Sequence, residues 1–440
     1  MNDDRRRFLA ASALGISALP MSGLMTRLAA AADAANARAC IVLWMSGGPS
    51  QLDTLDPKPD HDNGGEFAAI STAVPGIEVC EHLPGVAQQM RDIALVRSMA
   101  TKEGDHSRAT YLGHTGRLPA GAIDYPTLGS FVSEALPDRA SDLPPFVAIS
   151  PNRFLSPRAF APGFLGSKVA PLVVGDVNIV RPVNDQSGLQ VANLSPSADV
   201  DAARMQRRLE LLRSVQGEFR RDRPDAILTS HASAYEKAVR MMQSDAAEAF
   251  DTSGETPALR DRYGRNLFGE GCLVARRLVE RGVKFVEVSL NGVDGNNSGV
   301  GWDTHQRNFE AVRNLCGVLD PAWATLLADL RDRGLLDSTL VVWMGEFGRT
   351  PMINDLGGRD HSAVAWSTAL CGGGIRGGQV IGRTSDDGTL IEDRPVTMAD
   401  FHATVCRALR IDPAETNMSN VGRPIPRVEL EAEPLDELLM

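Results

Sequence analysis

The chain alternates short apolar runs with longer amphipathic segments, and this alternation restricts its fold more than any other feature. The apolar runs typical of buried strands are 41–45, 93–98, 146–150, 283–290 and 339–344. Helical patterns occupy much of the intervening sequence, at 199–222, 228–247, 265–282 and 307–333. Because apolar strands separated by helices are typical of parallel sheets covered on both faces, we predict an α/β fold. Its doubly wound sheet is mixed but mainly parallel, with helices on both faces.

The strand signal is weakest in the middle of the chain. Residues 151–262 contain little of it, and we predict that they form a helical insertion or cap. Residues 1–35 form a separate N-terminal segment, and residues 36–440 are predicted to fold as one domain. Since strands from both sides of the insertion are needed for one sheet, neither half is expected to fold alone.

The N-terminal segment has the pattern of an export signal. Arg5-Arg6 is followed by Phe8-Leu9 and by a weakly apolar run rich in alanine and glycine, which is typical of twin-arginine signal peptides. The alternatives are an amphipathic first helix and a membrane anchor. Because the run is too short and too weakly apolar to span a bilayer, we predict no stable membrane span in the mature chain. We expect the twin-arginine export machinery to carry it to the periplasm or another extracytoplasmic location.

The net charge and the spacing of the cysteines restrict which partners and which metal sites are expected. The formal net charge is −11, and no stretch combines basic with aromatic residues, so nucleic acid is not expected as a partner. Six widely spaced cysteines include no CxxC pair, which argues against a zinc ribbon. Their disulfide pairing stays open. Cys40 is also a candidate for lipid attachment, although Arg38 precedes it closely.

Polar clusters follow the predicted strands directly. They are Ser46–Asp56, His106–Arg117, Asn291–His305 and Gly345–His361. Parallel strands bring their carboxyl ends to one edge of the sheet, which is where α/β proteins bind ligands. We therefore predict one cleft built from these clusters.

Two clusters combine acids with histidines as metal sites do. Asp303 and His305 lie two residues apart, and Asp360 and His361 are adjacent. Carboxylate and imidazole together suit zinc, manganese or iron better than calcium, which prefers oxygen ligands. The structural alternative for Asp303 is to cap the helix predicted at 307–333.

Glu346 and Arg349 follow the apolar strand at 339–344. Burying such charges costs several kcal/mol unless they are paired or bound to a metal. We predict that Glu346 is a metal ligand and that Arg349 supplies positive charge to an anionic substrate. The alternative is that the two residues pair with each other.

The first two clusters add further candidates. Small residues at 47–49 let backbone N–H groups approach an anion. Ser50 is a candidate nucleophile and Asp53 a candidate metal ligand, although both also suit structural roles in a turn. His106 and Arg108 are both candidates for binding an oxyanion.

Several of these segments resemble the sulfatase and alkaline phosphatase superfamily. The segment from Leu319 to Trp343 resembles the helix and strand that precede a metal-binding motif in that superfamily. The resemblance implies that Glu346 is a metal ligand. It also places Phe347 where an Asn or His is usual. Residues 107–117 resemble the sulfatase signature, with Gly104 where the nucleophilic Cys or Ser belongs. The first-strand Asp-Gly of the superfamily reads Ser-Gly at 46–47.

A closer resemblance is to domain-of-unknown-function family 1501. Its motifs match at 47–58, 302–305, 345–351 and 358–361, and the resemblance covers nearly all of residues 40–412. It implies an alkaline phosphatase/sulfatase-like fold.

Two functions follow from the residues and the resemblance. The first is a metal-dependent periplasmic hydrolase of sulfate or phosphate esters, with one or two divalent ions (zinc, manganese or calcium) and an anionic small-molecule or glycan substrate. The alternative is a catalytically silent sulfatase-like protein that binds a metal or an anionic glycan. The metal ligands expected are Asp53, Asp303, His305, Glu346, Asp360 and His361. The catalytic residues expected are Ser50, Arg108 and Arg349.

Overall fold

The computed structural model describes residues 39–119, 121–136, 141–175, 189, 191, 200–221, 226–293 and 300–440. Contacts divide the chain into two units, Met1–Ala37 and Arg38–Met440. The predicted export signal lies outside the described residues, so the fold described below is that of the second unit.

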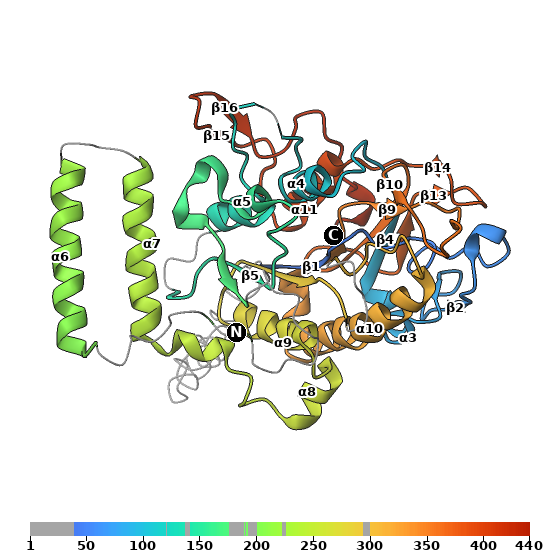
Figure 1. The fold of residues 1–440 in the computed structure, drawn as a ribbon, viewed down its shortest axis with the longest axis horizontal. Helices are drawn as coiled ribbons and strands as arrows, with labels where there is room; N and C mark the ends of the chain where they lie inside the picture. The colour runs from blue at the N-terminus through green and yellow to red at the C-terminus, as the bar shows by residue number, and fades with distance from the viewer. Residues whose placement is uncertain are drawn as a thin grey trace, which may run out of the picture. The chain divides into compact units, whose positions relative to one another are not determined.

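A β-sheet forms the centre of this unit (Figure 1). It has eight strands in the order β12-β4-β11-β8-β1-β7-β5-β6. The strands are β1 (Ala39–Met45), β4 (Ile93–Met99), β5 (Phe146–Ile149), β6 (Leu172–Val174), β7 (Phe285–Leu290), β8 (Thr339–Met344), β11 (Trp366–Gly372) and β12 (Gln379–Ile381). Of these strands, only β11 runs antiparallel to its neighbours. The sheet is therefore mixed and mainly parallel, which confirms the predicted fold class.

Strands from both halves of the chain contribute to this sheet. β1 lies between β7 and β8, and Leu43 is in register with both Val288 and Trp343. All residues of these three strands are buried, as expected for central strands covered on both faces. Cys40 is fully buried in β1, which is incompatible with the lipid-attachment alternative.

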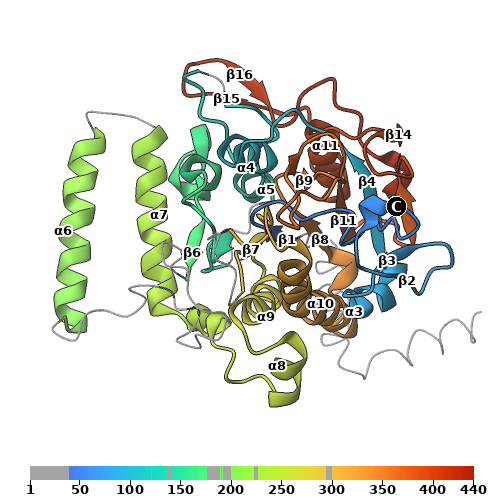
Figure 2. The same ribbon diagram turned by 45° about the vertical axis from the view of Figure 1, so that its right-hand side comes forward.

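Helices cover both faces of the sheet (Figures 1 and 2). On one face, α9 (Leu267–Glu280) and α10 (Asn308–Asp332) pack with α3 (Pro84–Gln88) around an apolar core. On the other face lie α4 (His106–Thr115), α5 (Leu128–Ala135) and α11 (Met398–Ala408), and residues of α5 and α11 belong to a second core. The sheet therefore separates two apolar layers.

Most of the described residues within 151–262 are helical, but β6 joins the edge of the central sheet. Its helices are α6 (Ala202–Arg221), α7 (Ala226–Gln243) and α8 (Pro257–Tyr263), with short 3-10 turns that include η3 (Pro157–Phe160), η5 (Ser167–Val169) and η6 (Asp245–Phe250). The sequence pattern missed β6 because three residues are too few to show a period. The assignment of this region as a cap stays a prediction.

In the part of the chain that the structure describes, four short hairpins extend the domain. They are β2 (Ala69–Ser71) with β3 (Glu78–Cys80), β9 (Gly348–Arg349) with β10 (His361–Ser362), β13 (Arg383–Thr384) with β14 (Ile391–Asp393), and β15 (Thr416–Met418) with β16 (Pro424–Pro426). No helix in the described part of the chain has both the length and the apolar character needed to cross a membrane.

Candidate functional site

The predicted clusters meet at one edge of the sheet. β1, β4, β7 and β8 run parallel and end at this edge, and the antiparallel β11 begins there. The hairpin of β9 and β10 spans the same edge, because His361 pairs with Arg349 directly after β8. The topology therefore gathers residues that are distant in the sequence, as expected for a ligand site in such a sheet.

Local sequence places His106 at this edge. Helix α4 begins at His106 because Asp105 acts as its N-cap and accepts a hydrogen bond from the Arg108 backbone N–H at 3.1 Å. The helix ends at Gly116, whose φ of 69° lies in the left-handed region. The imidazole thus projects from the first turn of a helix that follows β4.

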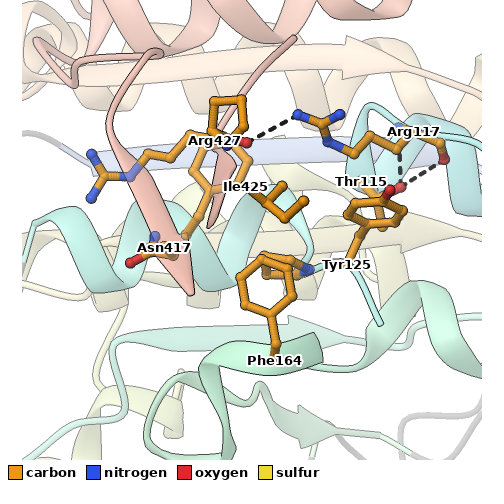
Figure 3. Close-up of a pocket in the computed structure, with 10 residues that line it drawn as sticks. Thr115, Arg117, Tyr125, Phe164, Asn417, Ile425 and Arg427 are labelled. Atoms are coloured by element: carbon orange, nitrogen blue, oxygen red, sulfur yellow. Dashed lines mark hydrogen bonds between the residues drawn. The ribbon is translucent and has the colours of Figure 1, made fainter. Parts of the chain in front are cut away.

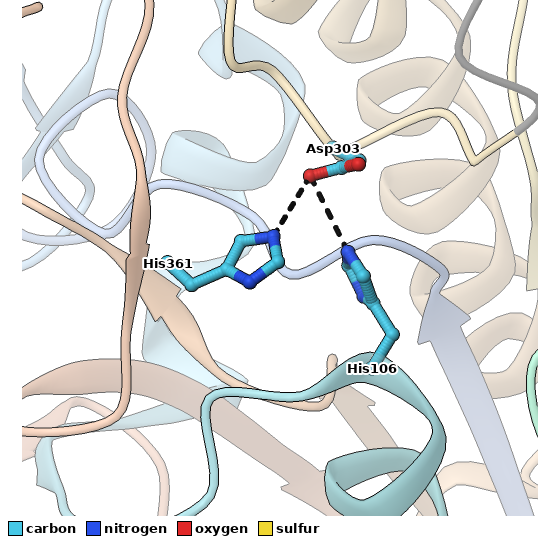
Figure 4. Close-up of side chains that lie close together, drawn as sticks. All are labelled: His106, Asp303 and His361. Atoms are coloured by element: carbon cyan, nitrogen blue, oxygen red, sulfur yellow. Dashed lines mark hydrogen bonds and ion pairs between the residues drawn. The ribbon is translucent and has the colours of Figure 1, made fainter.

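One carboxylate oxygen, Asp303 Oδ1, is the centre of the site (Figure 4). The Nε2 atoms of His305 and His361 each lie 3.1 Å from it, and that of His106 lies 3.3 Å away. The Nε2 atoms of His305 and His361 are themselves 3.0 Å apart. We call these four residues the His–Asp cluster. His106, Asp303 and His361 form a group whose ligand atoms all lie within 4.8 Å of one another.

The other ring nitrogen of each histidine contacts a hydrogen-bond acceptor. Each Nδ1 lies 2.8 Å from its acceptor, which is Glu346 Oε1 for His106, Asp360 Oδ1 for His305 and the backbone oxygen of Gly104 for His361. A carbonyl or a carboxylate only accepts, so each Nδ1 carries a hydrogen. A neutral ring then presents a lone pair on Nε2 to the shared centre, which is how second partners orient histidine ligands of metals.

Charge is unevenly distributed in the His–Asp cluster. Burial raises the pKa of Asp303, but the contacts with His106, His361 and Arg349 outweigh burial and hold that pKa well below its usual range. Burial lowers the pKa of His106, but Asp303 and Glu346 raise it to about 9. Without a cation the centre therefore attracts protons, and a metal ion would compete with them.

Glu346 reaches the cluster through His106. Its Oε1 also accepts a hydrogen bond from the backbone N–H of Gly47 at 2.9 Å. Its Oε2 is buried and has no hydrogen-bond partner in the described part of the chain. Glu346 thus orients His106, and its second oxygen is open to a further proton or cation.

Arg349 is fully buried and faces Asp303 rather than solvent. Its guanidinium donates to Asp303 Oδ1 at 2.8 Å and to the backbone oxygens of Gly47 and Gly48. The side-chain amide of Gln51 holds its backbone on both sides, at 2.9 and 3.0 Å. Burial lowers the pKa of Arg349, and Asp303 opposes that effect. The arginine therefore ties the loop after β1 to Asp303.

Phe347 packs between two of the histidines. Its ring centroid lies 4.9 Å from that of His106 and 4.6 Å from that of His361. A bulky aromatic residue here limits the rotamers of both imidazoles. The residue that departs from the superfamily pattern thus supports the cluster by packing.

Glycines let the loops of the site touch along their backbones. A Cβ on Gly47 would lie 2.4 Å from the backbone nitrogen of Asp303, and one on Gly358 would lie 1.9 Å from the backbone oxygen of His305. Gly47 also has a φ of 115°, which side chains rarely permit. The loops after β1 and β7 and the β9–β10 hairpin therefore interlock.

The structure does not bring Asp53 to the His–Asp cluster. Both carboxylate oxygens bind Arg359, with Nε at 2.7 Å and Nη2 at 2.9 Å, and Asn308 Nδ2 donates at 2.8 Å. Asp53 and Arg359 are fully buried. This bidentate pair is a structural contact, and Arg359 was not singled out in the sequence because its partner lies 306 residues away.

Ser50 and Arg108 also lie outside the cluster. The Ser50 hydroxyl is buried in the turn, 3.4 Å from the backbone nitrogen of Asp53. Arg108 is half-exposed and pairs with Glu103 at 2.5 Å. Neither contact places a nucleophile or an oxyanion-binding group beside Asp303.

Asp303 does not cap the helix that follows it. Helix α10 begins at Asn308, and Arg307 occupies the N-cap position. Conversely, His106 belongs to the cluster although the sequence marked it only as a partner for an oxyanion. The sequence feature that could have identified His106 is its position at the start of a helix that follows a buried strand.

The fold and the cluster define an α/β protein with a set of histidine and carboxylate groups at the carboxyl edge of its sheet. Within that class, the chain belongs to the family described as Protein of unknown function (DUF1501), whose model matches residues 37–439. No curated protein matches the chain.

Among solved structures, the chain is similar to a sulfatase from a Pseudoalteromonas species, at 13% identity over 86% of this chain and 69% of that chain, with a TM-score of 0.39. It is similar to the phosphonate monoester hydrolase of Agrobacterium radiobacter, at 11% identity over 91% and 77% of the two chains, with a TM-score of 0.35. It is also similar to the lipoteichoic acid synthase of Listeria monocytogenes, at 8% identity over 86% and 73%, with a TM-score of 0.38.

Proposed function

We propose that the chain is a metal-dependent hydrolase of sulfate or phosphate esters, acting outside the cytoplasm. The observation that carries the proposal is the convergence of imidazole Nε2 atoms on Asp303 Oδ1, at 3.1 to 3.3 Å. Neutral rings would bring lone pairs to the same point, and a cation at their centre offsets the resulting repulsion.

The residues proposed to hold the ion are His106, Asp303, His305 and His361. Glu346 and Asp360 would orient two of the rings through Nδ1. A donor set with three nitrogens and one carboxylate fits zinc, and also manganese or iron, better than calcium. A bound divalent cation supplies a Lewis acid that polarises an ester oxygen.

An anionic substrate would need the ion because of the acidic side chains around the site. Asp303, Glu346 and Asp360 are acids, and the guanidinium of Arg349 is already engaged by Asp303 and by backbone oxygens. A sulfate or phosphate group approaching these acids would be repelled unless a cation is bound.

Metal analysis of the purified protein tests the first step. We expect a transition metal in stoichiometric amount and hydrolysis of 4-nitrophenyl sulfate or 4-nitrophenyl phosphate that a chelator abolishes. A protein without bound metal, whose activity is unaffected by chelators and by His361→Ala, would contradict the proposal.

The second candidate function is metal or anionic-glycan binding without catalysis. It is favoured by the position of Ser50, whose hydroxyl faces the Asp53 backbone rather than the His–Asp cluster. Bound metal together with no turnover of either ester, and metal-dependent retention on a sulfated polysaccharide, would support it.

The proposed location rests on the N-terminal pattern and on the cysteines. All six cysteines are buried and unpaired. Free buried thiols suit a chain that folds in a reducing compartment and is exported already folded. Replacing Arg5, Arg6 and Arg7 by lysine should leave the protein in the cytoplasm on fractionation, whereas unchanged recovery outside it would contradict twin-arginine export.

A further inference from the structure

Helix α6 exposes an apolar stripe. The side chains of Leu211, Val215 and Phe219 are 66%, 56% and 49% exposed, and their spacing of four residues puts them on one face. Half-buried Met205 and Leu209 lie on another face. Helix α6 packs against α7, and the two helices stand side by side in both views (Figures 1 and 2).

Helix α7 attaches this pair to the domain. Ser230 Oγ accepts a hydrogen bond from the Lys168 backbone N–H at 2.8 Å, and Met241 is buried in the core beneath. α7 also packs against η5 and η6. These contacts attach α7 to the domain, and the exposed stripe on α6 is a candidate interaction surface.

The charge of α6 is opposite to that of the whole chain. Its sequence contains six arginines and two glutamates, a net charge of +4, whereas the chain carries −11. The exposed arginines Arg207 and Arg208 lie directly before the stripe. A basic helix with an exposed apolar face is typical of helices that lie on membranes.

We propose that α6 docks onto an anionic membrane surface, with Leu211 and Val215 entering the headgroup region and the arginines contacting lipid phosphates. The helix would lie in the plane of the surface. This proposal is independent of the hydrolase function.

A second copy of the chain is a less suitable partner for the exposed face of α6 than an anionic membrane. Two α6 helices would bring like charges together. Of the cavities formed by described residues, one is lined by Arg117 and Arg427 (Figure 3), and another by Arg407 and Arg410 together with Asp412 and Glu429. A basic helix is not complementary to the first of these cavities, whose lining contains arginines and no acid.

Vesicle flotation with the full chain tests the proposal. We expect binding to vesicles that mix phosphatidylcholine equally with phosphatidylglycerol, release at high salt, and no binding to phosphatidylcholine alone. The double variants Leu211→Ser with Val215→Ser, and Arg207→Glu with Arg208→Glu, should each lower the bound fraction by roughly tenfold or more. Leu390→Ser and Leu430→Ser are matched controls, because these side chains are 61% and 70% exposed.

All variants share the N-terminal segment, so a loss confined to the α6 variants assigns binding to α6. Circular dichroism and thermal melting check that the variants fold. Absence of binding to the mixed vesicles, or equal binding by all variants, would overturn the proposal. A concentration-dependent dimer in sedimentation analysis, abolished by the Leu211→Ser and Val215→Ser pair, would assign the stripe to a second copy instead.

Discussion

Asp303 Oδ1 lies 3.1 Å from Nε2 of His361, and this contact joins the loop after β7 to strand β10 across the edge of the sheet. Nδ1 of the same histidine is held by the backbone oxygen of Gly104, in the loop after β4. One imidazole thus connects loops that follow two strands of the sheet. The following predictions depend on contacts of this kind.

Replacing a histidine of the cluster should remove bound metal while the fold is retained. We expect His361→Ala and His106→Ala to weaken metal affinity by about 100-fold or more, because each removes one nitrogen donor. His231→Ala, on the exposed face of α7, is the matched control. Elemental analysis after dialysis measures the effect, and full metal content in both cluster variants would contradict the assignment.

Asp360 is expected to act on the metal through His305. Asp360→Asn should lower metal affinity by about 10- to 100-fold, because the amide no longer fixes the His305 ring as a carboxylate does. The exposed Asp355, in the same hairpin loop, provides the control Asp355→Asn. Competition with a chromogenic chelator compares the two variants, and equal affinities would show that the Asp360 contact is incidental.

The buried pair of Asp53 and Arg359 should contribute stability rather than metal binding. Asp53→Asn leaves the guanidinium of Arg359 without its charged partner, so we expect a loss of about 3–5 kcal/mol in the free energy of unfolding. Urea denaturation of this variant, of Arg359→Gln and of the double variant gives the coupling between them. If Asp53→Asn loses metal but not stability, Asp53 is a ligand after all.

His402 should make the protein sensitive to mild acid. Burial is the main cause that lowers its pKa from 6.5 to about 4, and its Nδ1 has no partner among the described residues. A base whose pKa is lowered in the folded state binds a proton more readily when unfolded. The stability it contributes is therefore complete above pH 6.5 and falls between pH 6.5 and about 4, by about 3 kcal/mol.

Urea denaturation across this pH range measures that slope. His402→Phe lacks the titrating group but retains a ring of similar shape, so its stability should depend less on pH even if it is lower throughout. Parallel pH profiles for the two proteins would show that His402 does not cause the acid sensitivity.

The sequence by itself determined five strands of the central sheet, which are β1, β4, β5, β7 and β8, but not β6, β11 or β12. The apolar run at 339–344 was predicted as a strand and is β8, and the helix predicted at 307–333 is α10. These elements follow from the periodicity of neighbouring residues, which is a local property. Asp303, His305 and His361 were also identified from the sequence, because acids and histidines after strand ends are placed at one edge by the topology.

Only the tertiary structure decided which of the candidates meet. Asp53 and Asp303 are both acids that follow central strands. Asp53 forms a bidentate ion pair with Arg359, whereas Asp303 is surrounded by imidazoles. His106 lies 240 residues before its partner Glu346. Such choices depend on side chains that approach each other only after the strands have paired and the helices have packed. No local pattern records these contacts, because their energies arise from partners that are distant in the sequence.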